Sequence, residues 1–216
     1  MITPLEFKIT ADMLESMIGE IPFIDFKLTI NNPTGDFFYD PWEISSKFKG
    51  TIWEKVLSTL PYKLGEARLI KLPKKECYMA HADIDNRWHL PIVSGKSFLV
   101  DLENKVMHTL RPLTWHYMDA GKDHSAVNFG GDDRVQLVIR ELLTNAKLKN
   151  PKQVIIKPKD NPPNHIRYIF DYVYSPILNK LNYSGKMNSF KIAGNSVMFN
   201  TEQDVIIPTH ENFLIL

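Results

Sequence analysis

The sequence predicts a mainly β protein of the α+β class, built around an antiparallel barrel or sandwich with flanking helices. Eight short β-type runs follow one another between Gly65 and Leu143, separated by turns such as DIDN, SG and GGDD. Short strands with such regular turns are typical of antiparallel barrels and sandwiches. The chain has 216 residues, of which 44% are hydrophobic, which is enough for one domain with a sizeable core.

The N-terminal region is expected to supply an entry strand and two short helices. Thr10 can cap a helix over Ala11–Ile18, whose apolar residues share one face. Thr51 and Glu54 have the spacing of a capping box, so a second helix begins there, and Pro61 stops it.

Two further segments lie between and around these helices. Residues 22–30 (PFIDFKLTI) alternate between apolar and polar side chains, which predicts a strand. Residues 36–50 are aromatic and irregular. Their aromatic side chains either line a substrate entrance or pack on the outside of a sheet; these are Phe37, Phe38, Tyr39 and Trp42.

The β region is expected to contain strands over residues 67–72, 77–83, 87–93, 96–102, 105–110, 113–118, 125–129 and 134–142. The DIDN turn is a candidate hairpin between the second and third of these runs. Gly130 and Gly131 provide the positive φ that a tight hairpin needs, which predicts that the last two runs are antiparallel neighbours.

The C-terminal region has a different character. Residues 150–164 are rich in Pro and Lys and are interpreted as a connector, and residues 165–181 as a helix that Pro176 breaks. Residues 186–216 alternate weakly and form either two more strands or a lid. We therefore expect a barrel domain with N-terminal helices over residues 1–150 and a C-terminal extension or cap over residues 151–216.

Charge and cysteine content restrict the partners. The net charge of +1 provides no field for nucleic acid or an anionic membrane, and no apolar stretch approaches membrane-spanning length. Seven histidines and a single cysteine, Cys77, favour a metal site with nitrogen and oxygen ligands and fit a reducing compartment. A cytoplasmic protein that acts on a small molecule is expected; nothing indicates an oligomeric state.

Three residues form the candidate metal centre: His81, Asp83 and the distant His124. Residues two apart in a strand share a face, so His81 and Asp83 can reach one metal ion, and Arg87 and His89 share a face of the following run. Two histidines and one carboxylate hold one face of Fe(II) and leave its other positions open. His116 is the reserve ligand if His124 does not reach the site.

Arg134 is the candidate anion binder. Its strand places Arg134, Gln136, Val138 and Arg140 on one face, and the planar fork of a guanidinium suits a carboxylate. Arg140 is the second choice, or it pairs with Glu141 or Glu103. Asp85 is interpreted as a turn residue rather than a ligand, and Trp88 and Trp115 as packing residues. Asn128 either donates a hydrogen bond to the site or makes a sheet contact, and Tyr78 is a candidate cosubstrate contact. His165 and His210 are interpreted as structural residues outside the barrel.

The order HAD, RWHLP, DAGKDHSAVN and then Arg134 resembles the aspartyl/asparaginyl β-hydroxylase-like branch of the Fe(II)/2-oxoglutarate-dependent oxygenases, over residues 65–142. The resemblance implies a double-stranded β-helix (jelly-roll, cupin-like) barrel. It implies His81, Asp83 and His124 as the catalytic metal ligands, and Arg134, which would hold the C5 carboxylate, as the main cosubstrate residue. The pair Arg87 and His89 would help to hold 2-oxoglutarate or nearby groups.

The resemblance further implies a dioxygenase with Fe(II), 2-oxoglutarate and O2. It would hydroxylate an amino-acid or peptidyl side chain and decarboxylate 2-oxoglutarate to succinate. Two alternatives stay open: a cupin-type metalloprotein that does not use 2-oxoglutarate, and a non-catalytic jelly-roll binding module.

Overall fold

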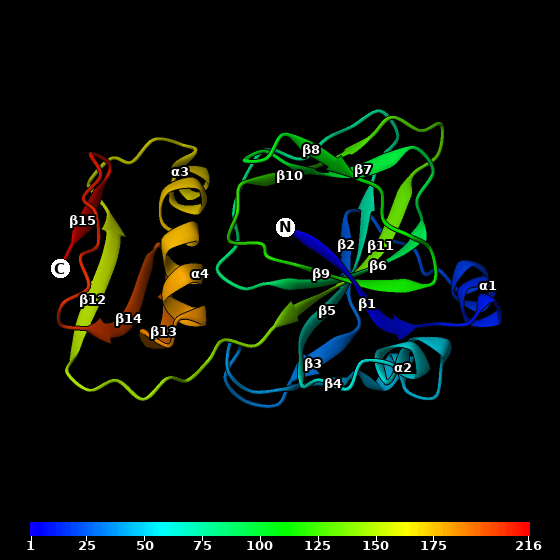
Figure 1. The fold of residues 1–216 in the computed structure, drawn as a ribbon, viewed down its shortest axis with the longest axis horizontal. Helices are drawn as coiled ribbons and strands as arrows, with labels where there is room; N and C mark the ends of the chain where they lie inside the picture. The colour runs from blue at the N-terminus through cyan, green and yellow to red at the C-terminus, as the bar shows by residue number, and fades with distance from the viewer.

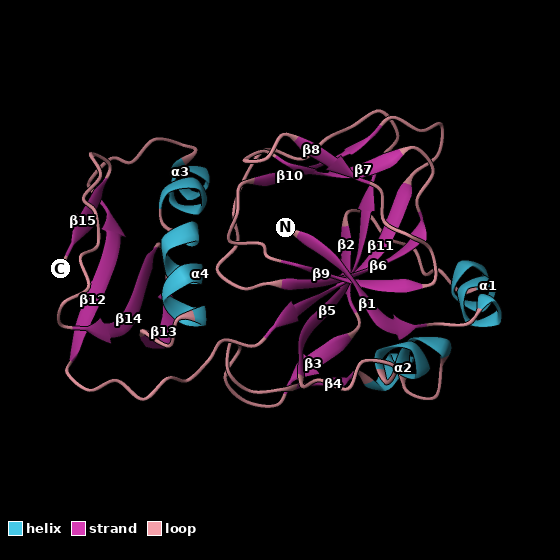
Figure 2. Cartoon of the chain, viewed as in Figure 1, coloured by secondary structure: helices cyan, strands magenta, loops and turns pink.

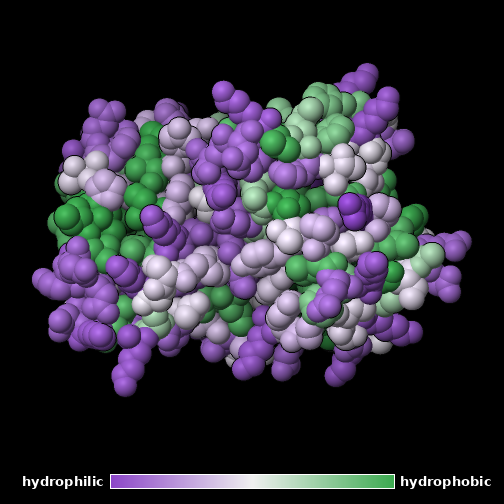
Figure 3. All heavy atoms as spheres, in the orientation of Figure 1, coloured by the Kyte–Doolittle hydropathy of each residue, from purple (hydrophilic) through white to green (hydrophobic).

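The computed structural model describes residues 1–216 and shows a mainly β protein whose strands far outnumber its helices (Figure 2). Figure 1 shows two parts side by side: a large barrel-like part and a smaller C-terminal part. No helix is long and apolar enough to cross a membrane. The face seen in Figure 3 is largely hydrophilic, with smaller hydrophobic patches on both parts.

The large part contains two antiparallel sheets. The six-stranded sheet has the order β1 (Ile2–Lys8), β9 (Thr114–Met118), β6 (Arg87–Val93), β11 (Arg134–Glu141), β5 (Leu64–Leu72) and β2 (Lys27–Thr29). The three-stranded sheet has the order β10 (His124–Asn128), β7 (Ser97–Asp101) and β8 (Val106–His108). Side chains of both sheets line one cavity, so the predicted jelly-roll-like barrel is confirmed.

One face of the six-stranded sheet packs in the apolar core, and the other faces the cavity. On β11, Val135, Leu137 and Ile139 lie in the main apolar core, while the alternate residues face the cavity. Helices α1 (Ala11–Gly19) and α2 (Ile52–Leu57) cover the core side, and Trp88 and Trp115 pack there as predicted. The helices thus bury one face of the central strands, and the opposite face lines the cavity.

Both predicted helix caps are present. The Thr10 hydroxyl accepts a hydrogen bond from the Met13 amide at 3.2 Å, and the Thr51 hydroxyl accepts one from Trp53 at 3.3 Å. The Glu54 carboxylate accepts from the Gly50 amide at 2.6 Å, one residue before the cap. Between the helices, β3 and β4 form a small antiparallel pair and a 3-10 turn follows; their bounds are Asn31–Pro33, Trp42–Ile44 and Ser46–Phe48.

The strand predicted over residues 22–30 is shorter than expected. Only Lys27–Thr29 pairs, as the edge strand β2 against β5. Phe23 is 89% and Phe26 52% exposed, and Ile24 alone among the apolar residues 23–26 is buried in the main core. Alternation without a partner strand is therefore not enough to extend β2.

The path around the metal-ligand segment also differs from the prediction. Residues 77–83 form no regular strand and no hairpin with β6; the segment joins β10 through single bridges at Cys77 and His81. The β10–β11 hairpin is also wrong, because the two strands belong to different sheets. Neither Gly130 nor Gly131 has a positive φ.

Asn128 explains how the chain crosses between the sheets after β10. Its side-chain amide donates to the carbonyls of Leu72, Pro73 and Asp132, at 2.9 to 3.2 Å. Its side-chain oxygen accepts from the Gly130 amide at 2.9 Å. The turn is therefore held by an asparagine side chain rather than by glycine geometry.

The connector predicted over residues 150–164 is wrong in its first half. Residues Pro151–Pro158 form β12, an interior strand of a four-stranded antiparallel sheet with the order β13 (Met187–Ala193), β14 (Ser196–Glu202), β12 and β15 (Phe213–Ile215). Val154 and Ile156 are buried in its core. Their alternation is masked in the sequence by the flanking Lys and Pro residues.

Two helices, α3 (Ile166–Val173) and α4 (Ser175–Tyr183), lie between this sheet and the barrel (Figure 1). The break at Pro176 is confirmed, because Pro176 lies in the first turn of α4, where its missing N–H costs nothing. The C-terminal core also takes in Ile84 and Leu143 from the large part. The C-terminal part thus packs against the barrel directly beside the candidate metal ligands.

Candidate metal centre

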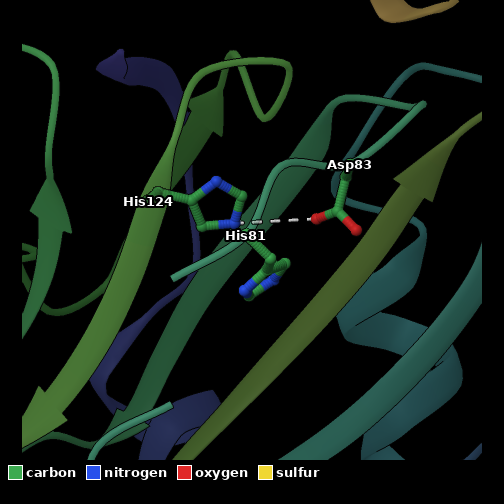
Figure 4. Close-up of side chains that lie close together, drawn as sticks. All are labelled: His81, Asp83 and His124. Atoms are coloured by element: carbon green, nitrogen blue, oxygen red, sulfur yellow. Dashed lines mark ion pairs between the residues drawn. The ribbon is translucent and has the colours of Figure 1, made fainter. Parts of the chain in front are cut away.

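His81, Asp83 and His124 converge in space. Each offers one ligand atom, and these atoms all lie within 4.8 Å of one another. The backbones of His81 and His124 pair through two hydrogen bonds of 3.0 and 2.9 Å, and the Asp83 amide donates to the Ala120 carbonyl. Figure 4 shows the three side chains close together, with the ion pair between His124 and Asp83 as a dashed line.

Hydrogen bonds to the backbone orient both imidazoles. Nδ1 of His81 lies 2.8 Å from the Met79 carbonyl, and Nδ1 of His124 lies 2.8 Å from the Lys122 carbonyl. A carbonyl only accepts, so Nδ1 is the donor in each ring. In both rings Nε2 is therefore the nitrogen left to bind a metal, an arrangement common in metal-binding histidines.

The electrostatics favour a cation at this point. Burial raises the pKa of Asp83, but the charges of Arg87, His124 and His81 outweigh it and hold that pKa well below its usual range. Burial lowers the pKa of His124 to about 4, although Asp83 opposes this. His124 Nε2 lies 3.7 Å from the Asp83 carboxylate with no proton between them at neutral pH. Two imidazole nitrogens and a carboxylate with free lone pairs fit a divalent ion such as Fe(II).

Arg87 holds the Asp83 carboxylate in place. Its guanidinium forms two contacts with Asp83, at 2.8 and 3.3 Å, and a third with Asp85 at 2.8 Å. Asp85 in turn pairs with Arg140, whose guanidinium lies over the rings of Phe37 and Phe38. Arg87 therefore contacts the candidate metal ligand, and only its Nη1 lacks a partner.

This network bears on three expectations. Asp85 lies in a bend and outside the ligand cluster, as expected, but it is 2% exposed and links two arginines. Arg140 pairs with Asp85 and not with Glu141 or Glu103. His116, the reserve ligand, points elsewhere, since its Nε2 accepts from the Arg111 amide at 3.2 Å.

The ligand cluster opens into a cavity of about 640 Å³ between the two sheets of the barrel. Arg134 lines it, is 4% exposed and forms no ion pair, and its Nε has no hydrogen-bond partner. Burial lowers the pKa of Arg134 to about 10, so it stays charged at neutral pH. A buried cation without a counter-ion is costly, and an anionic ligand would offset that cost.

His89 and Tyr78 flank this cation. Nδ1 of His89 lies 3.1 Å from the Gln136 side-chain oxygen, and its buried Nε2 has no partner. Burial lowers the pKa of His89 to about 3, so the ring is neutral. The Tyr78 hydroxyl donates to the Lys71 carbonyl at 3.2 Å, while its side chain lines the cavity.

Several residues that line the cavity were not predicted from the sequence. Arg68 lies on the cavity side of β5, and His165, which was interpreted as structural, lines the cavity with three residues of α3: Arg167, Tyr168 and Asp171. Three of these four recur at helical spacing, at positions 165, 168 and 171. The spacing was a usable signal for one helix face, but the sequence did not show that this face meets the barrel.

The metal-free protein is expected to lose stability as the pH falls from 6.5 to 4. His124 has a pKa of about 4 when folded and 6.5 as its ordinary value. The unfolded state therefore binds more protons in this window, and the free energy of unfolding falls by about 3 kcal/mol through His124 alone. Urea unfolding at pH 7 and pH 4.5 measures this. The dependence should weaken in His124→Gln, while the part that buried His89 contributes in the same window remains. An unchanged stability would contradict the burial of neutral His124.

Comparisons with known proteins give only distant likenesses. No family model matches the sequence, and no curated protein is similar to it. A cupin domain from Bordetella pertussis Tohama I is similar to 38% of this chain over 84% of its own length, with 16% identity and a TM-score of 0.33. A 2OG-Fe(II) oxygenase family oxidoreductase from Burkholderia pseudomallei has 10% identity and a TM-score of 0.43, covering 64% of this chain and 82% of its own.

HygX from Streptomyces hygroscopicus, solved with nickel and 2-oxoglutarate bound, has 8% identity and a TM-score of 0.44. The likeness covers 68% of this chain and 86% of HygX. Similarities this weak carry no conclusion about function.

Proposed function

We propose that this protein is an Fe(II)- and 2-oxoglutarate-dependent dioxygenase that hydroxylates an amino-acid or peptidyl side chain. One observation supports the proposal above all. The His81, Asp83 and His124 cluster and the unpaired guanidinium of Arg134 open into the same cavity. A cation site and an anion site in one cavity match a ligand that chelates a metal at one end and carries a carboxylate at the other.

The first part of the site would hold the metal. Nε2 of His81, Nε2 of His124 and the carboxylate of Asp83 would occupy one face of Fe(II). When bound, Fe(II) supplies the activation of O2 that is coupled to decarboxylation of 2-oxoglutarate to succinate. Backbone carbonyls orient the two imidazoles, and Arg87 holds the Asp83 carboxylate.

The second part would hold the cosubstrate. Arg134 would pair with the C5 carboxylate of 2-oxoglutarate, and its burial strengthens that pairing. Neutral His89 offers its free Nε2 to the same cavity, while its contact with Gln136 fixes the ring. Arg87 would act mainly through Asp83, with its Nη1 left for the ligand.

The motif order supports a place in the aspartyl/asparaginyl β-hydroxylase-like branch. The segments HAD, RWHLP and DAGKDHSAVN, followed by Arg134, carry this finer assignment. In the structure, these segments contribute the three candidate metal ligands and the cavity residues Arg87 and His89.

Succinate formation tests the proposed function. Purified protein would be incubated in air with Fe(II) and 2-oxoglutarate, alone and with a panel of amino acids and peptides. We expect succinate that depends on iron, and a gain of one oxygen atom in the accepted substrate, both read by mass spectrometry. If no panel member raised succinate above the iron-free control, the proposal would fail.

Replacing Arg134 with Gln is expected to weaken 2-oxoglutarate binding by about 10- to 100-fold. A hydrogen bond to a charged group contributes about 1.5–3 kcal/mol, which corresponds to that change. Metal affinity should stay within about twofold of the wild type, since Arg134 contacts no candidate ligand. Calorimetric titration of 2-oxoglutarate into the Ni(II)-loaded variant measures the effect.

Arg111→Gln is the control for this experiment, because Arg111 is exposed and lies outside the cavity. If Arg134→Gln and the wild type bound 2-oxoglutarate with equal affinity, Arg134 would not be a 2-oxoglutarate-binding residue. A protein that binds metal but not 2-oxoglutarate would instead favour a cupin-type metalloprotein.

A further inference from the structure

A second arginine at the mouth of the cavity also lacks a good partner. Arg68 lies on β5, its side chain is 17% exposed, and its buried Nε has no hydrogen-bond partner. The nearest carboxylate oxygen is that of Glu66 at 3.7 Å, too far for a hydrogen bond. The other oxygen of Glu66 accepts from the Thr29 hydroxyl at 2.9 Å. Arg68 is therefore a cation that faces the cavity with little compensation.

Arg68 and Arg134 occupy different positions along the cavity. Arg68 pairs with Val138 across β5 and β11, whereas Arg134 pairs with Leu72. Their backbone positions are thus separated by four residues along the strands, or roughly 13 Å. Arg134 is buried in the barrel, whereas Arg68 lies next to residues of α3, so the two cations offer separate positions for anionic groups.

The structure surrounding Arg68 belongs to both parts of the molecule. A second cavity of about 270 Å³ continues the first one between the barrel and α3. Arg68, Asp83, Arg87 and two residues of α3, Arg167 and Asp171, line both cavities. A molecule seated there would touch Arg68 and lie beside the candidate ligand Asp83.

Four acidic residues line this second cavity, and three of them are paired with other arginines; the fourth, Glu66, lies 3.7 Å from Arg68. Asp83 and Asp85 pair with Arg87, and Asp85 also pairs with Arg140. Asp171 pairs with Arg167 at 3.1 Å. Of the basic residues that line both cavities, only Arg68 and the exposed Lys27 on β2 have no carboxylate within hydrogen-bond distance.

We propose that Arg68, assisted by Lys27, binds the carboxylate of the substrate that is oxidised. This inference rests on the proposed function and narrows it to a free acid, such as an unblocked amino acid, in place of a residue inside a peptide. A carboxylate carries one charge, which the nearby Asp83, Glu66 and Asp171 repel less than the two charges of a phosphate. The substrate would extend from Arg68 toward the metal centre.

Matched acids and amides test the Arg68 subsite. Free L-amino acids and their primary amides would be titrated calorimetrically into protein that holds Ni(II) and 2-oxoglutarate, with the amides standing in for a peptide linkage. At least one acid should bind the wild type, and its amide should bind about 10- to 100-fold more weakly. Arg68→Gln should lower the affinity for that acid by a similar factor. The affinity of this variant for 2-oxoglutarate should stay within about twofold of the wild type.

Lys71→Gln is the matched control, since it removes a positive charge from the same strand but lines neither cavity. It should bind the acid within about twofold of the wild type. The proposal is overturned if no acid binds more tightly than its amide, or if Arg68→Gln retains wild-type affinity. Repeating the titrations without metal and 2-oxoglutarate separates the Arg68 subsite from the proposed dioxygenase function. Loss of acid binding in Arg68→Gln would support the subsite even if the wild type failed to bind 2-oxoglutarate.

Discussion

Replacing Asp83 with Asn is expected to lower the affinity for Fe(II) or Ni(II) by more than about 100-fold. Changing a residue that only supports a metal ligand costs about 10- to 100-fold in affinity, so removing the charged ligand itself should cost more. Asn has nearly the shape of Asp but carries no negative charge, and it cannot form the two charge-assisted contacts with Arg87. Calorimetric titration of Ni(II) into metal-free protein measures the change.

Asp119→Asn is the control for Asp83→Asn. Asp119 lies in the turn before His124 and approaches only Lys122, at 3.9 Å. Its substitution should leave metal affinity within about twofold. If Asp83→Asn bound metal within about tenfold of the wild type, Asp83 would not be a ligand.

Replacing Asp85 with Ala is expected to lower the free energy of unfolding by about 3–5 kcal/mol. Asp85 is 2% exposed, accepts hydrogen bonds from Arg140 and forms an ion pair with Arg87. Without it, buried Arg140 has no carboxylate partner, and Arg87 keeps only that of Asp83. Breaking a buried ion pair from one side leaves an uncompensated charge, which is the costly case. Urea unfolding of the metal-free protein at pH 7 measures the loss.

Asp119→Ala is the comparison for this stability measurement, because the pair of Asp119 with Lys122 is half-exposed. Its loss should cost less than about 1 kcal/mol. A similar small loss in Asp85→Ala would show that the arginine network is not a supporting element of the site. The result bears on function, since Arg87 orients Asp83 only while its own position is held.

The sequence predicted well how residues on the regular strands are placed. The strand over Arg87–Val93 has the predicted bounds, and the face of β11 that carries Arg134 was assigned from alternation alone. Alternation of apolar and polar residues predicts the strand faces reliably there, because one face packs in the apolar core and the other lines the polar cavity. His81, Asp83 and His124 also converge as the motif order indicated.

Strand pairing and the role of the C-terminal region could not be predicted in the same way. The position of residues 77–83 depends on single bridges to β10, and the crossing after β10 depends on the amide of Asn128. Neither leaves a periodic signal. The contribution of Arg68 and α3 to the cavity depends on how the two parts pack, which a local pattern does not encode.

Metal-dependent binding of 2-oxoglutarate is the most direct test of a two-part site. The wild-type protein, first metal-free and then loaded with Ni(II), would be titrated with 2-oxoglutarate under anaerobic conditions in a calorimeter. Because the ligand should contact both the metal and Arg134, we expect one molecule bound per chain, at least about tenfold more tightly when Ni(II) is present. Equal affinity with and without Ni(II), or no binding to the Ni(II)-loaded protein, would contradict the account.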